Sequence, residues 1–273
     1  MIAVHGGAGG GGDAQVEGVR AALLAGAVVL DAGGPALDAA CAAVAVLEAD
    51  GRFNAGRGAV RTYDGGIELD AAVMTGHDRA AGAVAAVTNA AHPVRVARAV
   101  LDAGRAVLLA GPGADAFVVE KDLELAAADW FVTEANSSPA GTVGAVALDR
   151  SGKFAAATST GGMRRQRWGR VGDTPVIGAG TYADASCAVS ATGDGEAFIR
   201  AVFAHSIAVA VGAGATLADA CAAALDDVTA FGGTGGCVAI GGDGQVVLDH
   251  NTAVMPAGWA TSAADLHVQL AKP

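Results

Sequence analysis

The chain is poor in aromatic residues and in charge, and it has no long uninterrupted apolar run. Aromatic residues make up 4% and charged residues 16% of its 273 positions, whereas 52% are hydrophobic. Apolar stretches such as residues 201–214 are too short or too interrupted to cross a bilayer, and Met1 opens on a strand-like pattern without a basic leader. We therefore expect a cytoplasmic protein with no membrane partner, whose core is filled mainly by alanine and valine.

Cysteine is also scarce, and basic residues are outnumbered. The four cysteines are scattered without the close pairing of a zinc or redox motif, which favours small buried hydrophobes. The 28 acidic residues exceed the 17 basic ones and give a net charge of −11, which disfavours nucleic acid as a partner. No His or carboxylate spacing indicates a transition metal. A small-molecule or peptide partner is expected.

Glycine is abundant, at 41 positions, and it separates strand-like from helical segments. Expected strands lie at residues 1–5, 59–63, 67–74, 80–88, 106–110, 142–149, 153–160, 236–241 and 245–250. Expected helices lie at residues 13–31, 35–50, 93–101, 114–124, 195–211 and 217–228. A polar, linker-like segment at 133–141 divides the two groups of elements. This order predicts an α+β fold of stacked sheets with helices outside.

The first place that could carry chemistry is the glycine run at residues 6–12. Residues 7–12 satisfy the G-x-G-x-x-G pattern of dinucleotide sites between a strand and a helix, and Asp31 follows at the spacing such sites use. A run this rich in glycine fits the pattern in almost any register, however, and repeated βαβ units do not follow it. A structural turn is therefore the favoured interpretation.

The second place is the junction at Gly141 and Thr142, where the polar segment meets a strand. If residues 150–152 form a three-residue loop, the hairpin register places Thr142 opposite Thr160. A threonine here is ordinarily only a β-branched strand residue, but a free α-amine beside its hydroxyl would make it a nucleophile. A cut before Thr142 would free that amine, and glycine at 141 tolerates the strained backbone that such a cut needs.

Motifs in a fixed order along nearly the whole chain resemble those of the plant-type asparaginase and isoaspartyl-peptidase family of N-terminal-nucleophile hydrolases. They are HGGAG (5–9), GPALDA (34–39), FNAGRG (53–58), LDA (69–71), GTVGAVALD (141–149), ATSTGGM (157–163), GRVGDTP (169–175), GAG (178–180), ATGDGE (191–196), NT (251–252) and GW (258–259). The resemblance implies a four-layer αββα sandwich and a single domain over residues 1–273. It also implies self-cleavage between Gly141 and Thr142 into an α subunit (1–141) and a β subunit (142–273), which pair as an (αβ)2 homodimer.

The resemblance further implies catalytic roles around the new N-terminus. Thr142 would be the nucleophile, with its freed amine as base, and Thr160 would hydrogen-bond it. The Thr192 hydroxyl and the Gly193 N–H would form the oxyanion hole, a contribution of about 3 kcal/mol per donor. The implied reaction releases L-aspartate from β-aspartyl dipeptides, from L-asparagine, or from both.

Four further residues are implied at the substrate. Arg170 would bind the α-carboxylate, Asp173 the α-ammonium, and Gly195 and Asn54 would add contacts. The alternatives are that Arg170 and Asp173 simply pair with each other and that residues 192–195 form a helix cap. Taken together in the family's order, these residues favour the substrate site.

The family's loop for a structural sodium ion is the last feature implied, and no other cofactor is expected. Backbone carbonyls would hold the ion, and they belong to Leu47, Glu48, Asp50, Phe53, Ala55 and Arg57. The glycine run coincides with the family's N-terminal turn, so the dinucleotide hypothesis is set aside. Two alternatives stay open: a glycosylasparaginase-like amidase, and an unprocessed inactive homologue that acts as a binding protein.

Overall fold

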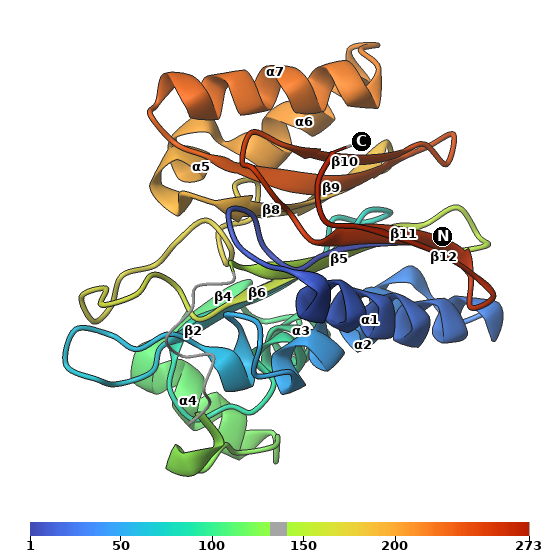
Figure 1. Ribbon diagram of the computed structural model, residues 1–273. Helices are drawn as coiled ribbons and strands as arrows, with labels where there is room; N and C mark the ends of the chain where they lie inside the picture. The colour runs from blue at the N-terminus through green and yellow to red at the C-terminus, as the bar shows by residue number, and fades with distance from the viewer. Residues whose placement is uncertain (132–140, 273) are drawn as a thin grey trace.

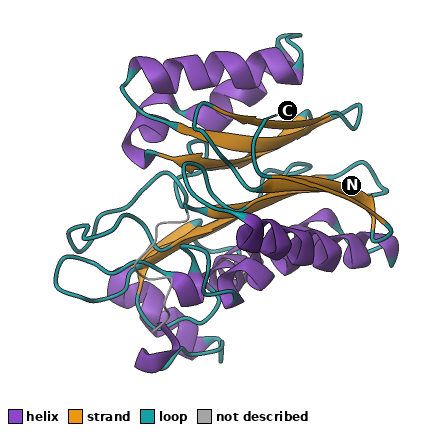
Figure 2. Cartoon of the chain, viewed as in Figure 1, coloured by secondary structure: helices purple, strands orange, loops and turns teal. Residues whose placement is uncertain are grey.

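Two β-sheets flanked by helices make up the computed structural model, which describes residues 1–131 and 141–272 (Figures 1 and 2). The helices are α1 Asp13–Asp31, α2 Ala36–Ala49, α3 Pro93–Ala103, α4 Gly111–Glu120, α5 Gly195–Ala201, α6 Phe203–Gly212 and α7 Leu217–Ala230, with 3-10 turns η1 Gly56–Gly58 and η2 Ala128–Phe131. The strands are β1 Ile2–His5, β2 Leu69–Thr75, β3 Ala81–Val87, β4 Leu108–Ala110, β5 Val143–Leu148, β6 Phe154–Thr160, β7 Thr181–Ala183, β8 Cys187–Gly193, β9 Gly235–Gly241, β10 Val246–His250, β11 Ala257–Ser262 and β12 Asp265–Gln269. The α+β class expected from the element order is confirmed.

The larger sheet contains eight strands in the order β12-β11-β1-β5-β6-β2-β3-β4, and the smaller contains four in the order β10-β9-β8-β7. Strand β1 lies between β11 and β5 and is antiparallel to both. The glycine run after β1 therefore opens a turn and does not begin the parallel βαβ unit that a dinucleotide site requires.

The two hydrophobic cores lie on different faces of the larger sheet. One core joins its outer face to α1, α2 and α3, and small residues dominate it, with alanine and valine throughout. The other core lies between the sheets and under α5, α6 and α7, which cover the smaller sheet in Figure 1. The expectation that alanine and valine replace aromatic side chains in the core is confirmed.

The hairpin of β5 and β6 has the register expected from the sequence. Val143 lies opposite Ser159, and the Asp149 N–H donates to the Lys153 carbonyl at 3.0 Å across the loop. Gly152 adopts φ 78°, the left-handed conformation such a loop assigns to glycine. Extending this register by one residue places Thr142 opposite Thr160.

Several elements differ from the prediction. Residues 59–63 form no strand, because the Thr62 hydroxyl and carbonyl engage Asp64 and Gly65 in a tight turn. The expected helix at 195–211 is divided at Val202, which has φ 48°. Strands β7, β8, β11 and β12 were not expected, and residues 133–140 of the predicted linker lie outside the described residues.

One stretch, Gly195–Gly212, has the length and mean hydropathy (1.3) of a membrane-spanning helix. Length and composition are weak support for such a span, since core helices pass the same test. Here the stretch forms two helices, α5 and α6, separated by the left-handed Val202. Their buried side chains, such as Phe198 and Phe203, join the core that lies under α5, α6 and α7.

Candidate functional site

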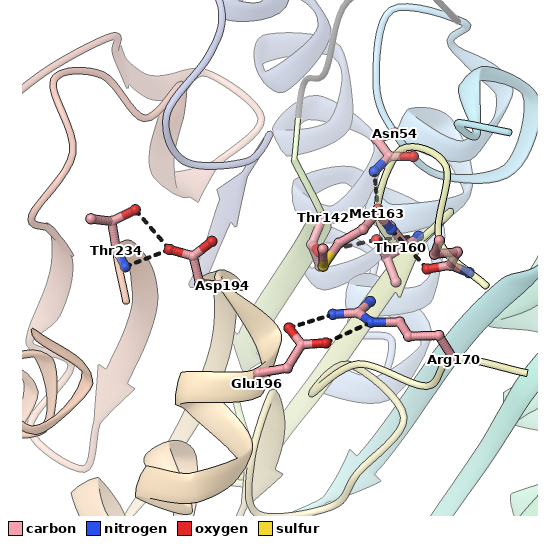
Figure 3. A network of polar contacts seen from close by, with 10 residues as sticks. Asn54, Thr142, Thr160, Met163, Arg170, Asp194, Glu196 and Thr234 are labelled. Carbon is pink, nitrogen blue, oxygen red and sulfur yellow. Dashed lines mark hydrogen bonds and ion pairs between the residues drawn. The ribbon is translucent and has the colours of Figure 1, made fainter. Parts of the chain in front are cut away.

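Thr142 lies at the buried entrance to β5, beside the hydroxyl predicted to face it. Its Oγ1 donates to Thr160 Oγ1 at 3.1 Å, and both side chains are buried (Figure 3). Thr160 Oγ1 also accepts from the Gly162 N–H at 3.1 Å. The sheet register and the following turn thus fix the pair. Sequence reasoning placed these two residues together correctly.

Gly141, which precedes this pair, is packed against the glycine turn that follows β1. A Cβ on Gly7 would lie 2.4 Å from the Gly141 nitrogen, and Gly7 has φ +105°. Only glycine permits this close approach of two backbones. The glycine run therefore helps to form the junction at Gly141.

Thr192 reaches the same junction from the other sheet. A Cβ on Gly141 would lie 3.0 Å from Thr192 Oγ1, and this hydroxyl accepts from the Ala8 N–H at 3.3 Å. Thr192 is fully buried at the end of β8 and does not cap α5. The helix-cap alternative is therefore wrong for Thr192.

Gly193 follows Thr192 in a conformation that favours glycine, with φ +150°. A Cβ at this position would lie 2.3 Å from the Thr234 carbonyl oxygen. The neighbouring Asp194 fixes the turn, because its carboxylate accepts from the Thr234 N–H at 2.7 Å and hydroxyl at 3.0 Å (Figure 3). This Asp194 contact was not anticipated from the sequence.

Arg170 is paired, but with Glu196 and not with Asp173. Its Nε and Nη2 donate to the two Glu196 oxygens, both at 2.9 Å, in a bidentate ion pair (Figure 3). The Arg170 side chain is mostly buried, whereas that of Glu196 is 59% exposed. The guanidinium therefore holds a carboxylate in fork geometry, as the substrate role demands, although here the carboxylate belongs to the chain itself.

Asp173 is a buried carboxylate beside this guanidinium. A Cβ on Gly195 would lie 2.8 Å from Asp173 Oδ1 and 2.9 Å from Arg170 Nη2, so only glycine at 195 lets the groups converge. Asp173 Oδ2 is buried without a hydrogen-bond partner among the described residues. Burial raises the Asp173 pKa to about 7, and the nearby Arg170 charge opposes that rise. A buried, unpartnered oxygen of this kind fits a cationic ligand.

Asp70 is a second buried carboxylate that sequence reasoning did not single out as a site residue. It lies opposite Thr160 in the β2–β6 register, and its Oδ1 accepts from the Ala86 N–H at 2.8 Å. Burial raises its pKa to about 6, and the Arg170 charge is among the opposing influences. An acidic residue inside an apolar strand was the signal that could have identified it.

Asn54 holds the turn that follows Thr160. Its Oδ1 accepts from the Val60 N–H at 3.0 Å, and its Nδ2 donates to the Gly162 carbonyl at 2.7 Å. Asn54, Gly141 and Gly162 line one hollow of about 400 Å³. The side chain therefore borders the predicted site, but both its polar atoms are engaged in shaping the turn.

A buried chain of polar side chains beneath Thr142 was also missed. His5 Nε2 lies 2.9 Å from Ser190 Oγ, which lies 2.8 Å from Thr158 Oγ1. Burial lowers the His5 pKa to about 3, so the imidazole is neutral at physiological pH. A histidine and hydroxyls in otherwise apolar strands were the available signal, and the network joins β1, β6 and β8.

Two carbonyls of the predicted sodium loop lie against glycines of the same loop. A Cβ on Gly56 would lie 2.6 Å from the Glu48 carbonyl oxygen, and one on Gly58 would lie 2.1 Å from that of Phe53. Oxygen donors of this kind suit a hard cation. The Glu48 side chain faces away and accepts from the Val94 N–H at 2.8 Å. Over the described residues, no cluster of three or more His, Cys, Asp or Glu side chains could hold a metal.

Comparison with known proteins matches this chain to one family along almost its whole length. A family model described as asparaginase matches residues 1–139 and 134–270. The isoaspartyl peptidase of Salmonella typhimurium is 41% identical over 95% of this chain and 94% of its own length. That of Escherichia coli is 42% identical over 95% of this chain and 92% of its own length. The isoaspartyl peptidase/L-asparaginase of Rattus norvegicus is 39% identical over 95% of this chain and 85% of its own length.

Proposed function

Because this chain belongs to the asparaginase family, we propose that it hydrolyses the side-chain amide of β-aspartyl dipeptides, of L-asparagine, or of both, and releases L-aspartate. The observation that carries the proposal is the hydrogen bond of 3.1 Å between Thr142 and Thr160 directly after Gly141. A third hydroxyl, that of Thr192, lies against Gly141 from the opposite sheet. These groups can supply a nucleophile and a stabilising donor on the two sides of one carbonyl.

Activation begins with a cut in the chain itself. In this proposal the Thr142 hydroxyl attacks the Gly141 carbonyl carbon, the C–N bond breaks, and an ester links Gly141 to Thr142 Oγ1. Water then hydrolyses the ester to a Gly141 carboxylate and a free Thr142 hydroxyl and α-amine, giving subunits of residues 1–141 and 142–273. The freed amine becomes the base beside the nucleophile.

Substrate hydrolysis would reuse the same groups. Thr142 would attack the side-chain amide carbonyl, form an acyl-enzyme and expel the amine, and water would then release aspartate. The Thr192 hydroxyl and Gly193 N–H would stabilise the oxyanion, while Thr160 would orient the nucleophile. Arg170 would exchange Glu196 for the substrate α-carboxylate, and Asp173 would bind the α-ammonium with its unpartnered oxygen.

The scaffold assignments belong to the same proposal. We assign the two flanked sheets to the four-layer αββα sandwich of N-terminal-nucleophile hydrolases, and we assign the predicted carbonyl loop around Gly56 to a structural sodium ion. The ion would rigidify the loop that carries Asn54 and take no part in the chemistry. We further propose that the processed protomers pair as an (αβ)2 homodimer, as the resemblance implies, and that this homodimer is cytoplasmic.

N-terminal sequencing of the purified protein tests the proposal most directly. The smaller fragment is expected to begin at Thr142, and Thr142→Ala is expected to stay one chain without hydrolytic activity. Thr142→Ser keeps a hydroxyl and is the matched control, expected to retain cleavage. A fragment with any other first residue, or an intact and inactive wild-type chain after long incubation, would contradict the mechanism.

A further inference from the structure

The loop that follows Thr160 carries an unusual concentration of positive charge for this acidic chain. The chain has 17 basic residues and a net charge of −11. Four of the basic residues fall in one seven-residue stretch, and they are Arg164, Arg165, Arg167 and Arg170. Arg170 is paired with Glu196 in the candidate site, which leaves the function of the others to be explained.

Two of these arginines share a surface hollow with two aromatic side chains. The hollow has a volume of about 310 Å³ and is lined by Tyr63, Arg165, Arg167 and Trp168, which we call the arginine–aromatic cleft. The two rings are 65% and 63% exposed. Among the described residues, neither arginine of the cleft has a carboxylate within ion-pair distance. Exposed rings beside unpaired guanidinium groups fit an anionic ligand with an apolar part.

The backbone under the cleft is held firmly. The Tyr63 N–H donates to the Gln166 carbonyl and the Arg165 N–H donates to the Arg61 carbonyl, both at 2.8 Å. The buried Gln166 side chain accepts from the Met163 N–H at 2.9 Å. These contacts join two segments of chain, so the cleft is a built feature and does not depend on the positions of the exposed side chains alone.

The same two segments line the hollow beside the candidate nucleophile. That hollow, of about 400 Å³, includes Val60 from one segment, Met163 from the other, and Gly141. In Figure 3, the side chain of Met163 lies next to Thr142. A ligand that extends from Thr142 past Met163 therefore follows the two segments that carry the arginine–aromatic cleft.

We propose that the arginine–aromatic cleft binds the leaving residue of a β-aspartyl peptide, with its carboxylate on Arg165 and Arg167 and its side chain against Tyr63 and Trp168. The inference rests on the proposed hydrolysis, in which the aspartyl end is held by Arg170. The residue beyond the scissile amide must then extend to the opposite side. In free asparagine that position is only an NH2 group, so the cleft favours dipeptides with a free carboxylate and an aromatic leaving residue.

The test compares three substrates with the processed enzyme: β-aspartyl-phenylalanine, the same dipeptide with a C-terminal amide, and L-asparagine. In the double variant Arg165→Gln/Arg167→Gln, kcat/KM for the free dipeptide is expected to fall about tenfold or more, mainly through KM, as charge-assisted bonds are lost. The other two substrates should change less than about twofold. Arg105→Gln removes an exposed arginine after α3 and is the matched control.

The aromatic part is tested separately with Trp168→Ala and Trp168→Phe. The alanine variant should lose the preference for phenylalanine over alanine as the leaving residue, and the phenylalanine variant should keep most of it. Unchanged ratios, or equal losses for all three substrates of the arginine variant, would overturn the inference while leaving the proposed hydrolysis intact. Absence of hydrolysis of every substrate by wild-type enzyme would instead overturn the proposed function along with it.

Discussion

The two sheets bring different groups to the candidate site. The eight-stranded sheet presents Thr142 and Thr160 from adjacent strands of one hairpin, whereas the four-stranded sheet presents Thr192 and Gly193 from the end of β8. The first pair is positioned by strand register. The second pair is positioned by how the sheets pack, because Thr192 meets Gly141 and Ala8 across the gap between them. Under the proposed function, the nucleophile and the oxyanion donors therefore depend on separate structural layers.

Removing the hydroxyl of Thr192 should remove an oxyanion donor supplied by the smaller sheet and leave the hydroxyl pair of the larger sheet in place. In processed enzyme, Thr192→Ala should lower kcat by about 10²-fold or more with little change in KM, since an oxyanion donor acts on the transition state. Thr192→Ser keeps the hydroxyl and should retain most activity. Steady-state kinetics on a β-aspartyl dipeptide decides this, and similar behaviour of the two variants would assign the oxyanion to other groups.

The packing between the sheets can be disturbed at Gly144. A Cβ there would lie 1.9 Å from Ser190 Oγ and 2.5 Å from His5 Nε2, so Gly144→Ala must displace the buried network. The expected loss is about 1–3 kcal/mol in the free energy of unfolding, the range for overpacking a core. Urea denaturation measures this loss. It is done in a Thr142→Ala background, in which the protein is expected to remain one chain. Gly152→Ala is the control variant. Gly152 lies in an exposed turn where a Cβ meets no other atom, so its φ of 78° makes backbone strain the only cost of the substitution. An equal loss in both variants would argue against a tight junction at Gly144.

Arg170 lies in the segment that connects the sheets, between β6 and β7. Arg170→Lys should raise KM about tenfold for β-aspartyl dipeptides, because an ammonium cannot make the bidentate contact, and self-cleavage should continue. The kinetic assay is paired with gel analysis of the same preparation. Failed cleavage with unchanged KM would show instead that the Arg170–Glu196 pair serves the fold.

The smallest expected effect is a pH dependence at Asp173. Its pKa is raised from 3.8 to about 7 in the native protein, so the native state favours the protonated form. Below pH 3.8, Asp173 is protonated in both the native and the unfolded state, so its raised pKa costs no stability. As the pH rises towards 7, the unfolded chain releases a proton that the native state retains, and stability is lost.

Asp173→Asn should remove this dependence. Between pH 5 and pH 6, the free energy of unfolding of the parent should fall by about 1 kcal/mol relative to that of the asparagine variant. Urea titrations at both pH values, again in a Thr142→Ala background, measure the difference. Parallel changes in the two proteins would place the Asp173 pKa near its ordinary value.

Sequence reasoning was most successful where register or local turn chemistry decides the structure. The three-residue loop expected at 150–152 was sufficient to pair Thr142 with Thr160. Sequence reasoning failed at β7 and β8, because residues 181–193 are rich in alanine and serine, and because β7 pairs with β8 and β8 pairs with the distant β9. The division of a helix at Val202 was equally hidden, since nothing in an apolar sequence indicates a left-handed residue there.

Partner choice at the site could not be predicted either. Arg170 was expected to pair with Asp173 if it paired at all, yet Glu196, 26 residues away in sequence, holds it. The choice follows from the Gly195 backbone, which brings the start of α5 next to the guanidinium. Contacts of this kind depend on tertiary packing, whereas the class of fold and the hydroxyl pair depend on local pattern.

The strand order of the larger sheet determines whether the two fragments of the proposed cut before Thr142 would stay together. Strand β1 of the first piece lies between β11 and β5 of the second, and β6 of the second piece lies beside β2 of the first. The pieces are thus interleaved, with backbone hydrogen bonds joining them at three boundaries within one sheet. Pulling them apart would expose unpaired strand edges on both, so dilution alone would not separate them. Under the proposed function, we therefore expect the chain to fold as one continuous polypeptide before the cut is made.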